Sequence, residues 1–200
     1  MALMIKTPPA SEPVSLTEAK SFLRITDSDD DALITSLITA VRQKAESWTR
    51  RSFITQTWTL WLDLVPEGFN VPIPLSPLQS ITHIKSYDLA NTASTFDSTN
   101  YLVDTASTPG RIALNDGQAW PTALRRINVL EVEFVAGFGD ASSIPESIKQ
   151  GILQWIKLLF ANKSKLYESD ESTSGLLELN RIPIPPAVMV LWEPYRVFKI

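Results

Sequence analysis

Apolar residues recur at helical spacing in the first quarter of the chain. Ser15 stands three residues before Glu18, the pattern of a capping box, and predicts a short helix that ends near Arg24. A longer helix is predicted after the acidic run at 27–31, because carboxylates complement the positive end of a helix dipole, and it ends near Arg51. Its apolar face consists of Leu33, Ile34, Leu37, Ile38, Val41, Ala45 and Trp48.

Helical spacing returns in the last quarter of the chain. Proline is favoured in the first turn of a helix, so Pro145 predicts the start of a helix. This helix is predicted to end near Asn162. Its apolar side consists of Ile148, Ile152, Trp155, Ile156, Leu159 and Phe160. A last short helix is predicted at Pro186–Trp192, before Pro194 stops it, and the polar segment 165–180 predicts a mobile loop.

Between these two helical stretches, apolar residues recur at every second position, which indicates β-strands. Trp58, Leu60 and Leu62 open the pattern. Further strands are predicted at Val71–Leu75, Ser80–Leu89, Asn100–Asp104, Arg111–Leu114 and Ile127–Ala136. Pro72 and Pro74 lack the donor that a sheet ladder needs, so their strand belongs at an edge. The strands are short and antiparallel by their spacing, which favours a sandwich or open barrel.

The pattern as a whole predicts the α+β class: a small helical bundle with an inserted antiparallel β domain and flexible termini. We expect an N-terminal arm at 1–14, a helical body at 15–51 plus 145–194, an inserted β domain at 52–144 and a C-terminal tail at 195–200. The arm is expected because prolines cluster there, and proline neither continues a helix nor pairs fully in a sheet.

Composition excludes several classes of site. The 200 residues contain no cysteine and one histidine, His83, so neither a cysteine-ligated nor a multi-histidine metal site can form, and we expect no metal or other cofactor. The net charge of -4 gives no basic field for tight duplex binding; residues 52–144 hold four basic and nine acidic side chains. No apolar run approaches the roughly 20 residues that span a bilayer, and we expect a cytoplasmic product.

Three motifs that could carry chemistry have simpler explanations. His83 alternates with isoleucines, which directs it towards solvent or an interface, and no glycine-flanked serine nucleophile accompanies it. The acidic run resembles the opening of a calcium loop, but Ala32 and Ile38 stand where glycine and glutamate are needed, so a helix cap is favoured. Gly137 and Gly139 lack the third glycine and the lysine of a phosphate loop and indicate a turn.

Aromatic and basic residues are the stronger signals of a partner. Trp61, Trp120 and Trp192 lie where periodicity or neighbouring prolines make full burial difficult, so core packing and partner contact both remain open for them. Two basic pairs, Arg50–Arg51 and Arg125–Arg126, could contact DNA or an acidic partner. The first pair equally complements the negative end of the long helix.

A series of segments, in their order along the chain, is typical of one family. The segments are "VSLTEAKSFLRI", "DDDALITSLITAVRQKAESWTRRSFITQTW", "PLSPLQSIT", "YLVD", "PGRIAL", "AWP", "VEFVAGFG", "IPESIKQGILQWI" and "PYR". From Val14 to Arg196 the chain resembles the head-tail connector (adaptor) proteins of long-tailed phages, prophages and gene transfer agents. The likeness is loose at Asn162–Lys165, and 165–180 diverges.

This resemblance implies a virion structural protein and no catalysis. The chain would form a ring, a dodecamer in the virion, beneath the portal protein at the head-tail junction, after assembly in the host cytoplasm. It would offer a docking surface for the stopper or tail, let DNA pass without sequence-specific binding, and contact no membrane. The interface that the resemblance implies consists of Trp192, Tyr195, Arg196 and Phe198, with Trp61 and Trp120 as further candidates.

Two other classes remain as alternatives. A tail-associated β-sandwich module that binds a sugar or receptor would need exposed aromatics on one sheet face, for which Trp58, Trp61, Tyr87 and Tyr101 are available. A small hydrolase would need paired carboxylates in a pocket. The acidic side chains available for it are Asp63, Asp88, Asp104, Glu131 and Glu133.

Overall fold

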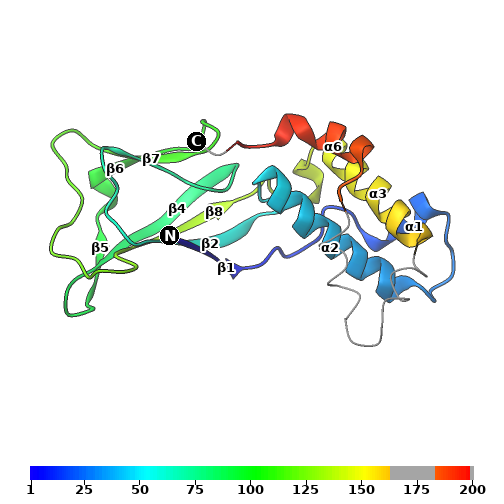
Figure 1. The fold of residues 1–200 in the computed structure, drawn as a ribbon, viewed down its shortest axis with the longest axis horizontal. Coiled ribbons are helices and arrows are strands. Elements are labelled where there is room, and N and C mark those ends of the chain that lie inside the picture. Colours follow the sequence, from blue (N-terminus) through cyan, green and yellow to red (C-terminus); the bar gives the residue numbers. More distant parts are fainter. Residues whose placement is uncertain (163–182, 199–200) are drawn as a thin grey trace. The chain divides into compact units, whose positions relative to one another are not determined.

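The computed structural model describes residues 1–162 and 183–198, in two compact units that are each built from two chain segments. One unit consists of Met1–Ala10 and Ile54–Phe138, and the other of Ser11–Phe53 and Gly139–Ile200. The first contains two antiparallel sheets and the second contains the helices, as Figure 1 shows. The predicted α+β class is therefore confirmed.

The helical unit follows the predicted helices closely. Its elements among the described residues are α1 (Leu16–Leu23), α2 (Asp31–Thr49), α3 (Glu146–Ala161), α6 (Pro186–Trp192) and the 3₁₀ turns η2 (Ala141–Ser143) and η3 (Glu193–Tyr195). The capping box is present, since the Ser15 hydroxyl accepts from the Glu18 N–H and the Glu18 carboxylate accepts from the Ser15 N–H. Asp31 lies in the first turn of α2 and pairs with Lys20 at 2.6 Å, which joins α1 to α2.

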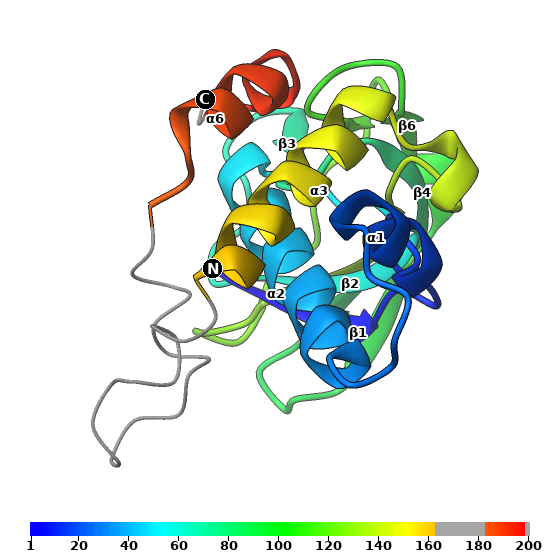
Figure 2. The same cartoon turned by 90° about the vertical axis from the view of Figure 1, so that its right-hand side faces the viewer.

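Helices α1, α2 and α3 pack on one another as a single body, as Figure 2 shows. Each presents one apolar side to the others, because residues three and four apart share a helix face. The buried apolar side chains of α2 and α3 are Ile34, Leu37, Ile38, Val41, Ala45, Ile148, Ile152, Leu153, Trp155, Ile156 and Leu159. This confirms the expectation that these helices form one core.

Helix α6 joins this core through Trp192, which is fully buried. The indole lies over Gly151 of α3, where an added Cβ would stand only 2.2 Å from the Trp192 Nε1. That nitrogen donates a hydrogen bond to the Ile148 carbonyl oxygen at 3.2 Å. The expectation that Pro194 and the local periodicity would hinder burial of Trp192 is wrong, because a residue without a side chain on the facing helix leaves room for the ring.

The β unit contains a five-stranded sheet of order β1-β2-β8-β4-β5 and a three-stranded sheet of order β3-β7-β6. Every strand pair is antiparallel. The strands are β1 (Ala2–Thr7), β2 (Gln56–Leu62), β3 (Asn70–Pro72), β4 (Leu78–Tyr87), β5 (Ala93–Phe96), β6 (Tyr101–Asp104), β7 (Arg111–Leu114) and β8 (Leu130–Ala136). Neither sheet closes into a barrel.

One apolar cluster draws on both sheets, so the β unit has the layered form of a sandwich. It combines inward residues of the central strands with residues of the smaller sheet and its loops: Leu60, Val71, Ile73, Leu78, Ile84, Tyr101, Ile112, Trp120, Val129, Leu130, Val132, Phe134 and Ala136.

Two strands test the reasoning about prolines. β3 ends at Pro72 and lies at an edge of its sheet, as predicted. The N-terminal arm was the wrong expectation for Ala2–Thr7, which pair with β2 as an edge strand. The reason is that Pro8 and Pro9 follow the strand rather than interrupt it, and an edge strand needs only one partner. β5 was not predicted, because its segment is short and polar.

Two further expectations concern the ends and the loop. The loop predicted at 165–180 lies outside the described residues. The start of the tail is held to its own unit, because the Val197 N–H donates to the Thr49 carbonyl oxygen at 2.9 Å. None of the helices in the ranges 1–162 and 183–198 is long and apolar enough to cross a membrane.

We expect Leu37→Asp to unfold the helical unit. Leu37 is 1% exposed, and an unpaired carboxylate in a core costs several kcal/mol. Thermal unfolding followed by circular dichroism measures the effect. Gln43→Asp, on the exposed side of the same helix, is the matched control and should change the melting temperature little. Equal melting temperatures for Leu37→Asp and wild type would contradict the assigned core.

Gly151→Ala should destabilise the helical unit even though alanine favours a helix interior by about 1 kcal/mol. The added methyl group collides with the Trp192 indole, so either α6 shifts or the ring leaves its site. Chemical denaturation of Gly151→Ala, Trp192→Phe and the double variant gives a double-mutant cycle. We expect the second substitution to cost less in the Gly151→Ala background than in wild type; strictly additive costs would argue against the contact.

Candidate functional site

The outer face of the five-stranded sheet carries a polar cluster. In β8, Leu130, Val132 and Phe134 are buried in the sandwich core, and strand alternation therefore directs Glu131 and Glu133 to the opposite face. β4 supplies His83, which is the cross-strand partner of Glu133. The three side chains converge because cross-strand and diagonal neighbours on one face lie within reach of one another.

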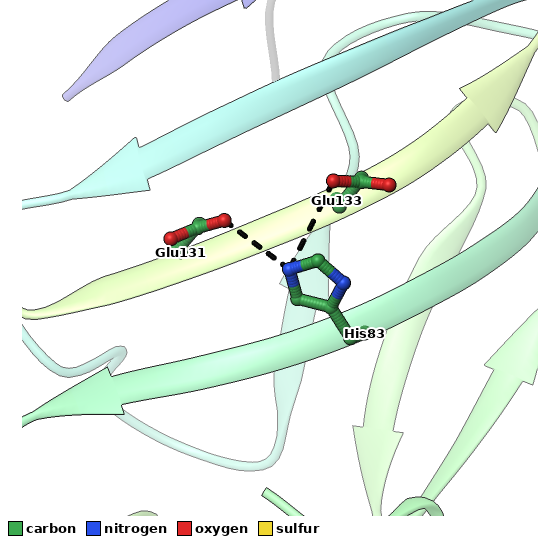
Figure 3. Close-up of side chains that lie close together, drawn as sticks. All are labelled: His83, Glu131 and Glu133. Carbon is green, nitrogen blue, oxygen red and sulfur yellow. Dashed lines mark hydrogen bonds and ion pairs between the residues drawn. The ribbon is translucent and has the colours of Figure 1, made fainter. Parts of the chain in front are cut away.

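Figure 3 shows His83 reaching from β4 towards both carboxylates of β8. The His83 Nε2 lies 3.2 Å from Glu131 Oε1 and 3.9 Å from Glu133 Oε2. All three side chains are largely withdrawn from solvent, with exposed fractions of 19% for His83, 13% for Glu131 and 8% for Glu133. Among the described residues, this is the set of acidic and histidine side chains close enough to hold a metal ion.

Two neighbours complete the cluster. Lys6 of β1 forms an ion pair with Glu133, and the Tyr87 hydroxyl donates a hydrogen bond to Glu131. Burial alone would raise the pKa of Glu131, but the hydrogen bonds from Tyr87 and His83 and the charge of Lys85 hold that pKa below its usual value. Burial and the hydrogen bond to the Glu131 carboxylate raise the pKa of Tyr87. Glu131 is therefore ionised at neutral pH, and its carboxylate accepts hydrogen bonds from Tyr87 and His83.

A cation-aromatic group adjoins the cluster through Tyr87. The Arg125 guanidinium lies 4.0 Å from the centre of the Tyr87 ring and 5.9 Å from that of Trp61, and the two rings are 5.7 Å apart. Arg125 Nε and Nη2 also donate to the Asn128 carbonyl oxygen, at 3.0 and 2.6 Å. Arg125 is thus fixed within its own unit, whereas Arg126 is exposed.

The C-terminal segment forms a second group, on the end of α2. The Arg51 Nε donates to the Tyr195 carbonyl oxygen at 2.5 Å, and burial lowers the pKa of Arg51. The Arg196 guanidinium lies 4.7 Å from the centre of the Trp48 ring and 5.2 Å from that of Phe198. Phe198 remains 65% exposed, and Arg196 is also exposed.

The predicted interface residues therefore fall into different environments. Trp192 is core and Trp120 is 8% exposed, with its Nε1 donating to the Gly68 carbonyl oxygen at 3.3 Å. The expectation that Trp120 resists burial is wrong, because Phe96 packs against its ring. Trp61 and Tyr195 are partly buried. Of the basic pairs, Arg51 and Arg125 bind carbonyl oxygens of their own units, while Arg50 and Arg126 are exposed.

The residues named for a sugar-binding module do not share one exposed face. Tyr101 lies in the sandwich core and Trp58 packs against it, whereas Trp61 and Tyr87 contact each other elsewhere in the unit.

The residues named for a hydrolase separate as well. Only Glu131 and Glu133 come together, while Asp63 pairs with the N-terminal amine and Asp104 binds Ser107 and Arg111. Asp88 accepts hydrogen bonds from backbone N–H groups of its own turn. The lowered pKa of Glu131 does not suit a general acid.

Sequence reasoning missed the cluster because its facing depends on strand register. The alternation of Glu131 and Glu133 with apolar neighbours is the one signal in the sequence that both share a face. The pairing of β8 with β4, and the shift of register between Ile81 and His83, could not be read from the sequence. Lys6 was missed because its segment was expected to be an arm.

Comparisons with known proteins point in one direction. Residues 13–109 match the sequence profile of the family described as phage gp6-like head-tail connector proteins. The fold is similar to that of a chain in the neck of an empty gene transfer agent particle, with a TM-score of 0.77 and 21% identity over 100% of this chain and 97% of that chain. A chain of the native gene transfer agent virion gives 0.76 at 19% identity, and one of the native neck, computed with C12 symmetry, gives 0.74 at 20%, each with the same coverage. No curated protein sequence matches the chain.

We expect Tyr87→Phe to raise the pKa of Glu131 towards its ordinary value of 4.5. Because the folded-state pKa of Glu131 is lowered, its ionised form stabilises the fold above about pH 4.5, and this contribution is lost as pH falls through the folded-state pKa. Carbon-detected NMR titration of the glutamate carboxyl groups measures the shift. Tyr101→Phe, which lies in the sandwich core, is the control and should leave the Glu131 titration unchanged. An identical Glu131 titration in wild type and Tyr87→Phe would contradict the hydrogen bond.

Proposed function

Since the chain belongs, through residues 13–109, to the phage gp6-like head-tail connector family, we propose that it is a virion structural protein that joins the head to the tail. The family match is the observation that carries the proposal. It spans α1 and α2 of the helical unit and β2 to β6 of the β unit, so it covers the combination of the two units rather than one of them. The likeness of fold over the whole chain agrees with it.

The proposed assembly is a ring of copies of this chain, twelve in the virion, placed beneath the portal protein. A closed ring needs one surface patch that repeatedly meets a different patch on the next copy. The stopper or tail docks on the opposite side of the ring, and DNA passes through its channel without sequence-specific binding. The excess of acidic over basic residues at 52–144 supports this, because like charge keeps DNA from adhering to the wall.

The portal-docking surface in this proposal is the exposed part of the C-terminal segment. Phe198 and Arg196 offer an apolar ring and a cation next to each other, and both residue types are enriched at protein interfaces. Tyr195 is half-buried, and its exposed part belongs to the proposed docking surface. Trp192 is buried in the core and supports the segment from within. Trp61 is a further, partly exposed candidate, while burial leaves Trp120 a supporting role.

The exposed arginines are the proposed contacts to DNA or to an acidic partner. Arg50 ends α2 in the left-handed conformation with φ of 56°, which directs the chain away from the helix axis. Arg126 is exposed beside the fixed Arg125. Either side chain could reach a phosphate or carboxylate without breaking a hydrogen bond that holds Arg51 or Arg125.

Native mass spectrometry and negative-stain imaging of the purified chain, with and without its portal protein, test the assembly. A closed ring, formed alone or on the portal, is the expected result. A chain that stays monomeric in the presence of portal at micromolar concentration would overturn the proposal.

We expect Phe198→Ala to weaken portal binding at least tenfold, which corresponds to about 1.4 kcal/mol. The melting temperature should not change, because Phe198 is 65% exposed. Val190→Ala, on the exposed side of α6 with 74% exposure, is the matched control and should bind the portal as wild type does. Portal binding is measured by surface plasmon resonance. A point substitution is preferable to removal of 195–200, which would also break the Val197–Thr49 hydrogen bond.

A further inference from the structure

The cluster of His83, Glu131 and Glu133 includes none of the residues named as docking or DNA contacts in the proposed function. The imidazole nitrogen and one oxygen from each carboxylate all lie within 4.8 Å of one another. Figure 3 shows the three donors facing a common point between β4 and β8. An imidazole with two carboxylates is a donor set for a first-row divalent cation rather than for Mg²⁺ or Ca²⁺, which take oxygen ligands.

The spacing of the donors suits a small ion. Zinc binds imidazole nitrogen and carboxylate oxygen at about 2.0–2.2 Å, so donors around one ion lie roughly 3–3.5 Å apart. The distance of 3.2 Å from His83 Nε2 to Glu131 Oε1 already falls in this range. The distance of 3.9 Å from His83 Nε2 to Glu133 Oε2 comes into the range when the Glu133 carboxylate rotates slightly. Both strands lie inside the sheet with partners on each side, which keeps the backbone of the site rigid.

The surroundings orient the ligands. Tyr87 binds the second oxygen of Glu131, which leaves Oε1 directed at His83. Outer partners of this kind fix metal ligands in position, and their loss usually costs about 10–100-fold in metal affinity. Because zinc takes the lone pair of Nε2, the loaded site has the imidazole proton on Nδ1.

The second observation that points to a cation is the ion pair with Lys6. Glu133 is a carboxylate only 8% exposed, and a buried charge requires an opposite charge. Lys6 supplies this charge from an edge strand, yet its own side chain is 54% exposed and can turn into solvent. The Lys6 ammonium group is therefore a counter-ion of Glu133 that another cation can replace.

We propose that His83, Glu131 and Glu133 bind one Zn²⁺ ion, and that Lys6 leaves Glu133 when the metal enters. Solvent water completes the coordination on the open side. Binding adds one link between β4 and β8, so the metal stabilises the β unit by mass action. The inference is independent of the proposed connector role.

Isothermal titration of tag-free protein with ZnCl₂ at pH 7.5 tests the site; the chain has a single histidine, so a histidine tag would mask it. We expect one Zn²⁺ per chain and a rise of several degrees in melting temperature at a hundredfold excess over the Kd. MgCl₂ at millimolar concentration should give no binding heat. Nitrogen NMR of the one imidazole should show a single, metal-dependent change to the Nδ1–H tautomer.

Variants separate a built site from zinc held loosely at surface carboxylates. His83→Gln should weaken zinc binding more than a hundredfold and Tyr87→Phe about 10–100-fold. Lys6→Gln should tighten binding severalfold, because the competing ammonium is gone. Glu67→Gln removes an exposed carboxylate of the same unit and should leave the affinity unchanged.

Absence of saturable one-to-one binding, or wild-type affinity in His83→Gln, would overturn the proposal. If His83→Gln does not fold, the wild-type NMR spectrum and Lys6→Gln decide. An imidazole that stays unperturbed by ZnCl₂ rejects the site, and weaker binding by Lys6→Gln rejects the exchange with the ammonium group.

Discussion

The alternation of β8 is the constraint on which the β unit depends. This strand lies in the middle of the five-stranded sheet, between β2 and β4, so its side chains must serve both faces. Leu130, Val132 and Phe134 fill the sandwich core, and the two glutamates between them can only face outward. A slip of one residue would place both carboxylates in the apolar core, at a cost that no hydrogen bond there could offset. The ion pair of Glu133 with Lys6 and the hydrogen bonds on the outer face therefore also favour this register of the sheet.

The helical unit depends in the same way on one close approach. Trp192 reaches the core only because Gly151 has no side chain, and its indole then contacts the rings of Trp48 and Trp155. Trp48 in turn lies under Arg196, so a buried packing detail determines where the exposed C-terminal residues are presented. In the proposed docking surface, the core tryptophan acts as a positioning residue for its neighbours rather than as a contact.

Features set by local spacing were predictable from the sequence. The capping box, the helix at Pro186–Trp192 and the strand at Arg111–Leu114 all follow from neighbours within one or two turns. Features that need a distant partner were not. β1 pairs with residues fifty or more positions away, Trp192 depends on a glycine in another helix, and His83 meets its glutamates only through strand register. Trp120 was misjudged for the same reason, since the ring that covers it comes from β5.

The division of each unit between two chain segments has a consequence for synthesis. The chain passes from one unit to the other after Ala10, after Phe53 and after Phe138, so neither unit is complete in a single stretch. During synthesis from the N-terminus, α1 and α2 are made before α3, which begins at Glu146, and before α6, which begins at Pro186. The core of the helical unit cannot be completed until both of these later helices have been made. A nascent chain that has not yet reached α3 and α6 thus has no finished helical unit.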